Sequence, residues 1–161
     1  MPLAAPALAA GRDVAMPDIL HRVGMNASPA KVYRALATLE GLSHWWIVGM
    51  TGDPSVGGTL HFRPEGGGFD MKVLESTPRR RVRWKCVGGP DDWVGTELIF
   101  RLKSRGGQTY VLFTHAGWRE PVEFMHHCST KWAVFLLSLV NWVERGEGRP
   151  HPYDVKIHPG D

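Results

Sequence analysis

The segment MHHCSTKWAVFLLSLVNW, residues 125–142, places large apolar side chains three and four positions apart. This spacing predicts one helix with a continuous apolar stripe. Pro121 precedes the segment and Gly146 follows it, so the helix should have roughly six turns. The stripe contains Met125, Cys128, Trp132, Phe135, Leu139 and Trp142. The opposite face carries Val134, Leu137 and Val140, which indicates that the helix packs against other parts of the protein on two sides. A homodimer that packs along this helix is one way to bury the second side.

Before this helix, six shorter segments alternate apolar and polar residues with the period of a β-strand. The clearest is 81–87, where Val82, Trp84 and Cys86 alternate with basic residues. The segments cover residues 19–25, 59–63, 69–75, 81–87, 96–103 and 109–115. Short turns rich in Gly and Pro separate the last five, which favours antiparallel hairpins over crossover connections.

Two short helices are predicted between the first and second strands. Ser28 is a good N-cap and Pro29 suits the first helical position, and Val32 and Leu36 then follow at helical spacing. A second helix is expected over residues 40–46. The predicted fold is therefore α+β: a curved antiparallel sheet of about six strands wrapped around a long C-terminal helix, with two short helices after the first strand.

The chain of 161 residues has the length of one domain. Residues 1–17 are rich in Ala and Pro, and we expect them to form a disordered tail. We assign residues 18–146 to a single domain and residues 147–161 to a Gly/Pro-rich tail. Nothing in the pattern indicates an internal repeat or a linker.

Composition argues against several classes of partner. The net charge of +3 is too small and too dispersed to indicate nucleic-acid binding. No apolar run approaches the roughly 20 residues that span a bilayer, so membrane insertion is not expected. The cysteines, Cys86 and Cys128, are far apart and outside any paired motif, which is typical of reduced thiols in a cytoplasmic protein.

Several short motifs, in this order and spacing, are similar to those of a known family. They are ASPAKVY (27–33), LSHWW (42–46), VGGTLHF (56–62), VLESTPRR (73–80) and TYVLFTHAGW (109–118). The chain resembles the SRPBCC (START/Bet v 1-like) superfamily over about residues 19–145, and within it the activator of Hsp90 ATPase homologue 1-like branch. The resemblance implies a helix-grip fold. It leaves the function open, because the superfamily includes lipid and hormone carriers, polyketide cyclases and oxygenase domains.

A curved sheet on a helix leaves a hollow whose walls are the inward residues of both layers. Large rings there either fill the space or line a cavity for an apolar ligand. The ligand-binding candidates are Trp45, Trp46, Phe62, Met71, Trp84, Phe100, Phe113, His115, Trp118, Trp132 and Phe135. We expect one ring of the Trp45–Trp46 pair to anchor the second helix and the other to sit at the cavity mouth.

His115 is the one candidate for catalysis, as an acid or base on the cavity wall, with a purely structural histidine as the alternative. The run His126-His127-Cys128 does not predict a metal site, because neighbouring helical side chains point about 100° apart. No cofactor motif is present: Gly66-Gly67-Gly68 lies between strands, not at a helix N-terminus.

Three functions remain open at this point. The first is binding of a small apolar or aromatic molecule between the sheet and the C-terminal helix. The second is a cyclase- or dehydratase-type enzyme that uses His115. The third, which the resemblance implies, is an interaction module for an Hsp90-like chaperone. The sequence identifies neither the ligand nor a reaction.

Overall fold

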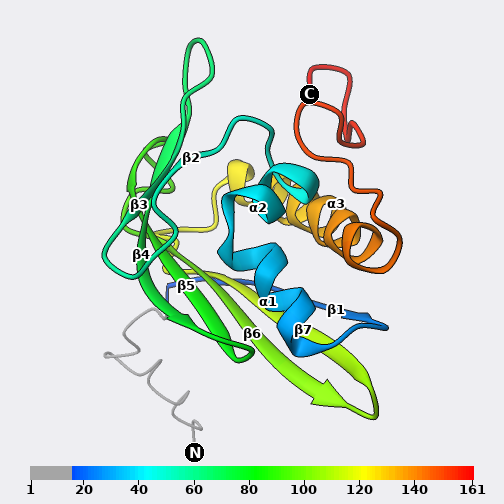
Figure 1. The fold of residues 1–161 in the computed structure, drawn as a ribbon. Coiled ribbons are helices and arrows are strands. Elements are labelled where there is room, and N and C mark those ends of the chain that lie inside the picture. Colours follow the sequence, from blue (N-terminus) through cyan, green and yellow to red (C-terminus); the bar gives the residue numbers. More distant parts are fainter. Residues whose placement is uncertain (1–15) are drawn as a thin grey trace, which may run out of the picture.

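The computed structural model describes residues 16–161. Seven strands form one antiparallel sheet in the order β1-β7-β6-β5-β4-β3-β2. They are β1 (Ile19–Met25), β2 (Thr51–Gly52), β3 (Thr59–Phe62), β4 (Phe69–Thr77), β5 (Arg81–Gly88), β6 (Glu97–Arg105) and β7 (Gln108–Ala116). The helices are α1 (Pro29–Ala37), α2 (Leu39–Trp45) and α3 (Glu123–Arg145). Figure 1 shows all three helices on the same face of the curved sheet, which confirms the predicted α+β helix-grip architecture.

The order of strands follows from the chain's short connections. Strands β3 to β7 form successive hairpins, and β1 closes the series by pairing with β7 in the register Val23 opposite Val111. The added seventh strand, β2, has two residues and pairs with β3. A strand this short is not long enough to show an alternating pattern, which is why the sequence indicated only about six strands.

Local signals set the start of α1 and the end of α3 as predicted, and a cap that was not predicted starts α2. The Ser28 hydroxyl accepts a hydrogen bond from the Lys31 backbone N–H at 3.2 Å, and Pro29 occupies the first helical position. Thr38 caps α2 in the same way, through the Gly41 N–H at 3.0 Å. Helix α3 ends at Gly146, whose φ of 73° lies in the left-handed region that glycine adopts without strain.

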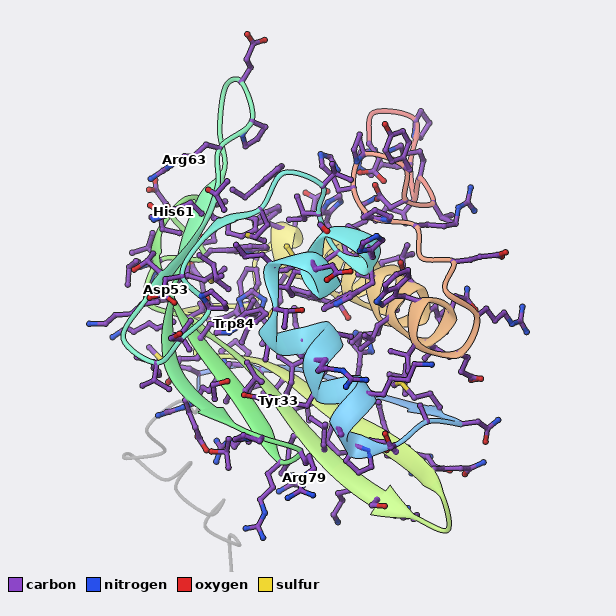
Figure 2. The ribbon with its side chains drawn as sticks, viewed as in Figure 1. Tyr33, Asp53, His61, Arg63, Arg79 and Trp84 are labelled. Atoms are coloured by element: carbon purple, nitrogen blue, oxygen red, sulfur yellow. The ribbon has the colours of Figure 1, made fainter. Side chains whose placement is uncertain are left out.

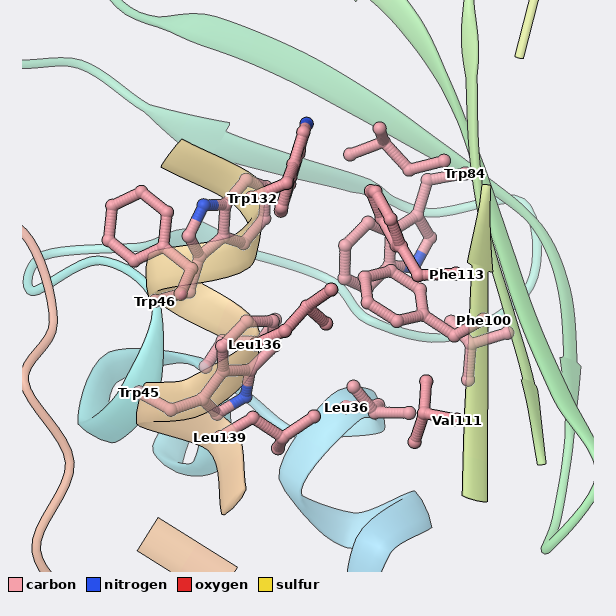
Figure 3. Packing of buried hydrophobic residues seen from close by; sticks show 14 of the residues in the cluster. Leu36, Trp45, Trp46, Trp84, Phe100, Val111, Phe113, Trp132, Leu136 and Leu139 are labelled. Carbon is pink, nitrogen blue, oxygen red and sulfur yellow. The ribbon is translucent and has the colours of Figure 1, made fainter. Parts of the chain in front are cut away.

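The core lies between the sheet and α3 and is dominated by aromatic rings. Trp84 and Phe100 project from the sheet, Trp132 and Leu136 from α3, and Trp45 from α2, and all are buried (Figure 3). Trp84 lies between the layers, whereas Arg63 is at the outer edge of the sheet (Figure 2).

The two ends of the chain differ. Residues 1–15 of the tail expected over 1–17 lie outside the described residues. The segment 147–161, assigned from composition to a second tail, lies against the domain. The Arg149 N–H donates to the Ser138 hydroxyl at 2.7 Å, the His151 N–H donates to the Trp46 carbonyl oxygen at 2.7 Å, and Asp154 is buried. No helix within residues 16–161 is long and apolar enough to cross a membrane.

Candidate functional site

A cavity of about 230 Å³ opens between α3, the end of the β3–β4 hairpin and the loop from β5 to β6. Its wall is mostly aromatic. The lining residues are Trp46, Ile47, Phe62, Phe69, Trp93, Phe124, His127, Cys128, Lys131, Trp132, Phe135, His151 and Asp161. A larger surface groove of about 340 Å³ lies beside α1 and the end of α3, but Trp142 is the one aromatic residue among those that line it, and Lys31, Arg34 and Glu40 place charges at its wall. The aromatic cavity is therefore the better candidate for a ligand site.

Each element contributes rings through its register. Phe62 and Phe69 are directly opposite each other where β3 and β4 begin their hairpin, and their ring centroids are 5.5 Å apart. Trp46 follows the last residue of α2 and stacks on Phe69 at 5.3 Å and on Trp84 at 5.7 Å. Helix α3 supplies Trp132. These rings are held by one another, so the wall is largely preformed.

Trp93 closes one side of the cavity from the loop between β5 and β6. Its indole N–H donates to the Cys128 sulfur at 3.4 Å, which ties the loop to α3. Burial raises the pKa of the Cys128 thiol to about 12. The thiol is therefore neutral at physiological pH, and it serves as an apolar wall residue and a weak acceptor.

The structure separates the predicted ligand-binding residues into two groups. Trp46, Phe62, Trp132 and Phe135 line the cavity. The others pack behind it or elsewhere in the core: Trp45, Met71, Trp84, Phe100, Phe113, His115 and Trp118, all with at most 1 % of their surface exposed. Trp45 anchors α2, because its indole N–H donates to the Ala35 carbonyl oxygen at 2.7 Å, while Trp46 faces the cavity.

His115 lies in the core and does not line the cavity. Trp93 packs edge-on against its ring at 5.2 Å and itself faces the cavity. Nδ1 of His115 accepts from the Trp132 indole N–H at 3.1 Å, and Nε2 is 2.8 Å from the Thr96 hydroxyl oxygen. Since the Thr96 hydroxyl donates to the Trp93 carbonyl oxygen, Nε2 carries the proton and donates to Thr96.

Burial lowers the pKa of His115 from 6.5 to about 3. The ring is therefore neutral near pH 7, and both of its nitrogens are occupied by hydrogen bonds. In this geometry His115 joins β7 to α3 and to the loop that carries Trp93. It has no free nitrogen with which to exchange a proton with a molecule in the cavity.

A polar edge completes the cavity, and sequence reasoning missed it. Lys131, on α3, forms an ion pair with Asp154 and a second with Asp161, whose Oδ2 is 2.5 Å from the ammonium nitrogen. Burial alone would lower the pKa of Lys131, but the hydrogen bonds to these two carboxylates outweigh it and raise that pKa. The same contacts lower the pKa of Asp154 and of Asp161 against the opposing effect of burial. All three groups are charged at neutral pH.

One set of side chains at this edge has the composition of a metal site. His127, His158 and Asp161 each place a ligand atom within 4.8 Å of the other two. The carboxylate of Asp161 is already bound by the Lys131 ammonium, and His158 accepts the Gly160 N–H at 3.1 Å through Nδ1. A cation there would lie close to a lysine that is itself positive, so the arrangement favours the ion pair over a metal.

The missed residues share a physical reason. Trp93 lies in a loop of Gly, Pro and Asp, where no periodicity indicates the direction of a side chain. His151 and Asp161 lie in the segment 147–161, whose composition is typical of a tail. Two further wall residues had a signal: Phe69 falls on the inward face of β4, and Cys128 falls on the apolar stripe of α3.

Comparisons with known proteins agree with the fold. The family model described as activator of Hsp90 ATPase homolog 1-like protein matches residues 26–144. The solution structure of the Aha1 dimer from Colwellia psychrerythraea is 48% identical, with a TM-score of 0.76, over 83% of this chain and 100% of that chain. CalU16 from Micromonospora echinospora is 22% identical, with a TM-score of 0.65, over 80% of this chain and 77% of that chain.

A third similar structure is DynU16, described as a putative protein in the dynemicin biosynthetic locus. It is 19% identical, with a TM-score of 0.69, over 81% of this chain and 48% of that chain. The structures below 25% identity support the fold alone. No curated protein sequence matches the chain significantly.

Proposed function

Because the chain belongs to the activator of Hsp90 ATPase homolog 1-like family, whose fold commonly binds hydrophobic ligands, we propose that it binds a small apolar or aromatic molecule in the cavity between the sheet and α3. The observation that carries the proposal is the wall of this cavity. Rings from α2, from the β3–β4 hairpin, from the β5–β6 loop and from α3 converge on one space of about 230 Å³. Such a space would bury most of an aromatic molecule's surface without reorganising the core.

The size of the cavity limits the ligand. Ligand pockets usually measure roughly 300–1,000 Å³, and this one is slightly smaller at about 230 Å³. A molecule of one or two fused rings fits, whereas a diacyl lipid would need the helix to move away from the sheet. The proposed occupant is therefore compact and flat.

Native mass spectrometry of the purified protein tests for a retained ligand. A thermal-shift screen of apolar and aromatic compounds then tests for stabilisation, which depends on ligand concentration when binding is specific to the folded state. Phe62→Ala removes a wall ring and should weaken every hit. Tyr110→Ala is the matched control, because this half-buried ring on β7 lies outside the cavity. The absence of a retained ligand and of any stabilising compound would contradict the proposal.

A homodimer packed along α3 is the second proposal. The Colwellia protein, at 48% identity, is described as a dimer. On α3, Leu137 is 59% exposed, and Val134 and Val140 beside it are only partly covered. Burying this apolar strip against a second copy would remove it from water. Light scattering should show a dimer that Leu137→Lys dissociates and that Val87→Lys, on the exposed face of β5, does not.

A role with an Hsp90-like chaperone is the third proposal, and the family description supports it. It predicts that the purified protein raises the ATPase rate of such a chaperone, and an unchanged rate would contradict it. We propose no reaction for the cavity, since the neutral His115 does not touch it. The buried cysteines Cys86 and Cys128, both free, are in keeping with a cytoplasmic location.

A further inference from the structure

The polar edge of the cavity contains one lysine held between two carboxylates of different accessibility. Lys131 lines the cavity wall, its side chain is 12% exposed, and its ammonium lies 5.8 Å from the centroid of the Phe135 ring. The Asp154 side chain on one side of it is 0% exposed and does not line the cavity. Asp161, on the other side, does line the cavity. The Lys131 ammonium therefore lies between its buried partner Asp154 and the aromatic cavity.

The two carboxylates are held differently. Asp154 is bound by Lys131 and also by Lys156, whose ammonium is 3.4 Å from Oδ1. Asp161 has Lys131 as its charged partner and otherwise accepts only the Ile157 N–H at 3.0 Å. Asp161 can therefore leave Lys131 at the cost of exposing its own carboxylate to water, whereas Asp154 would stay buried with Lys156 in place of two ammonium partners.

Charge at the edge favours an anion. Among the side chains of residues 16–161 that line the cavity, Asp161 is the only acidic one. Lys131 is the only one that is permanently positive, and His127 and His151 add positive charge when protonated. When Asp161 moves away, the two ammonium groups of Lys131 and Lys156 face the single carboxylate of Asp154. The edge then carries one uncompensated positive charge next to the aromatic wall.

We propose that the cavity binds an aromatic carboxylate, with its ring against Trp46 and Trp132 and its carboxylate on the Lys131 ammonium in place of Asp161. This inference rests on the proposed ligand-binding function and names the class of ligand. Desolvating a carboxylate is costly unless it is paired, and here the exchange keeps the ammonium paired throughout. When no ligand is bound, the Asp161 carboxylate occupies the Lys131 ammonium and so competes with the ligand for it.

The test compares two probes of the same shape that differ in charge. 2-Naphthoate is ionised at pH 7.5, and 2-naphthalenemethanol is neutral. Isothermal titration of the wild type should show tighter binding of naphthoate than of the alcohol. Asp161→Asn should raise the affinity for naphthoate about fivefold, because the Asp161 carboxylate no longer competes for the Lys131 ammonium. The affinity for the alcohol should not change.

Removal of the ammonium is the complementary change. Lys131→Met should weaken naphthoate binding about tenfold, the usual effect of losing one charge-assisted hydrogen bond, and should leave the alcohol unaffected. Because this variant leaves Asp154 buried beside a single remaining cation, the double variant Lys131→Met, Asp154→Asn removes both charges and should show the same loss with a stable fold. Lys103→Met is the matched control and should leave the binding of both probes unchanged, since Lys103 is exposed on β6 and lies outside the cavity wall.

The outcomes distinguish the two proposals. One outcome is that the alcohol binds in the cavity and that naphthoate binds no more tightly than the alcohol, either in the wild type or in Asp161→Asn. In that case the assignment of a carboxylate site is overturned and the apolar-ligand proposal stands. If naphthoate binding survives Lys131→Met and the double variant unchanged, the assignment is likewise overturned. If neither probe binds any variant, both proposals fail.

Discussion

Lowering the pH from 7.5 to 5.0 is expected to reduce the free energy of unfolding by about 2 kcal/mol through His115 alone. Burial lowers the pKa of this ring from 6.5 to about 3. In the unfolded chain the ring takes up a proton below about pH 6.5, whereas in the folded protein it stays neutral until about pH 3. The unfolded state therefore gains a proton first, and stability falls as the pH drops through this window.

The magnitude follows from linkage. A shift from 6.5 to about 3 corresponds to a full loss of about 5 kcal/mol once the pH is below both values, at 1.36 kcal/mol for each pKa unit. At pH 5.0, only the part between 5.0 and 6.5 has been lost, which is about 2 kcal/mol. The geometry gives the reason: Nδ1 faces the Trp132 indole N–H at 3.1 Å, so a proton on Nδ1 would set two donors against each other.

Urea unfolding of the wild type and of His115→Gln at both pH values measures this contribution. All other ionisable groups are common to both proteins, so their contributions cancel in the difference between the two pH-dependent losses. We expect the wild type to lose about 2 kcal/mol more than the variant. Equal losses would refute the reasoning. NMR of the His115 ring provides a check without substitution, since a titration midpoint near 6.5 in the folded protein would refute it as well.

Three further predictions concern the segment 147–161 and the cavity wall. Lys131→Met should destabilise the fold by about 3 kcal/mol in urea unfolding, because Asp154 is left buried, and adding Asp154→Asn should recover much of that loss; equal stability of the two variants would contradict it. Gly148→Ala should lower the melting temperature, because a Cβ there would overlap a backbone carbonyl oxygen of α2, whereas Gly160→Ala should not. The Cys128 thiol, with its pKa raised to about 12, should react with iodoacetamide at pH 8 far more slowly in the folded protein than in urea; equally fast labelling of the native protein would count against this.

The architecture was accessible from sequence because its main elements are periodic. The stripe from Cys128 to Val143 and the alternation of Val82, Trp84 and Cys86 both report which side of an element is buried, and the structure buries them as expected. Caps such as Ser28 and Gly146 are local chemistry and need no knowledge of the rest of the fold. These signals depend on neighbours within a few residues.

The site was less accessible because it depends on contacts between distant segments. His151 reaches the cavity through backbone hydrogen bonds with Trp46 and Val48, more than a hundred residues earlier in the chain. Asp161 is held at the cavity by its ion pair with Lys131. Neither residue lies in a periodic element, and their neighbours are Gly and Pro, so their sequence context resembles that of a solvated tail. Only the packed structure shows that the segment covers one end of the hollow.

The hollow itself shows what periodicity leaves undetermined. Trp84, Phe100 and Phe113 face inward as predicted, yet their rings pack on one another at 5.1–5.2 Å and fill the middle of the space. Trp46 and Trp132 extend this stack to where Phe62 and Phe69 turn into the β3–β4 hairpin, and there the rings line the cavity. Periodicity tells which face of an element a residue occupies, but whether inward rings fill or line a space depends on the distance between layers at that point. The cavity therefore lies at the end of the aromatic core, next to the charged group that we propose selects its ligand.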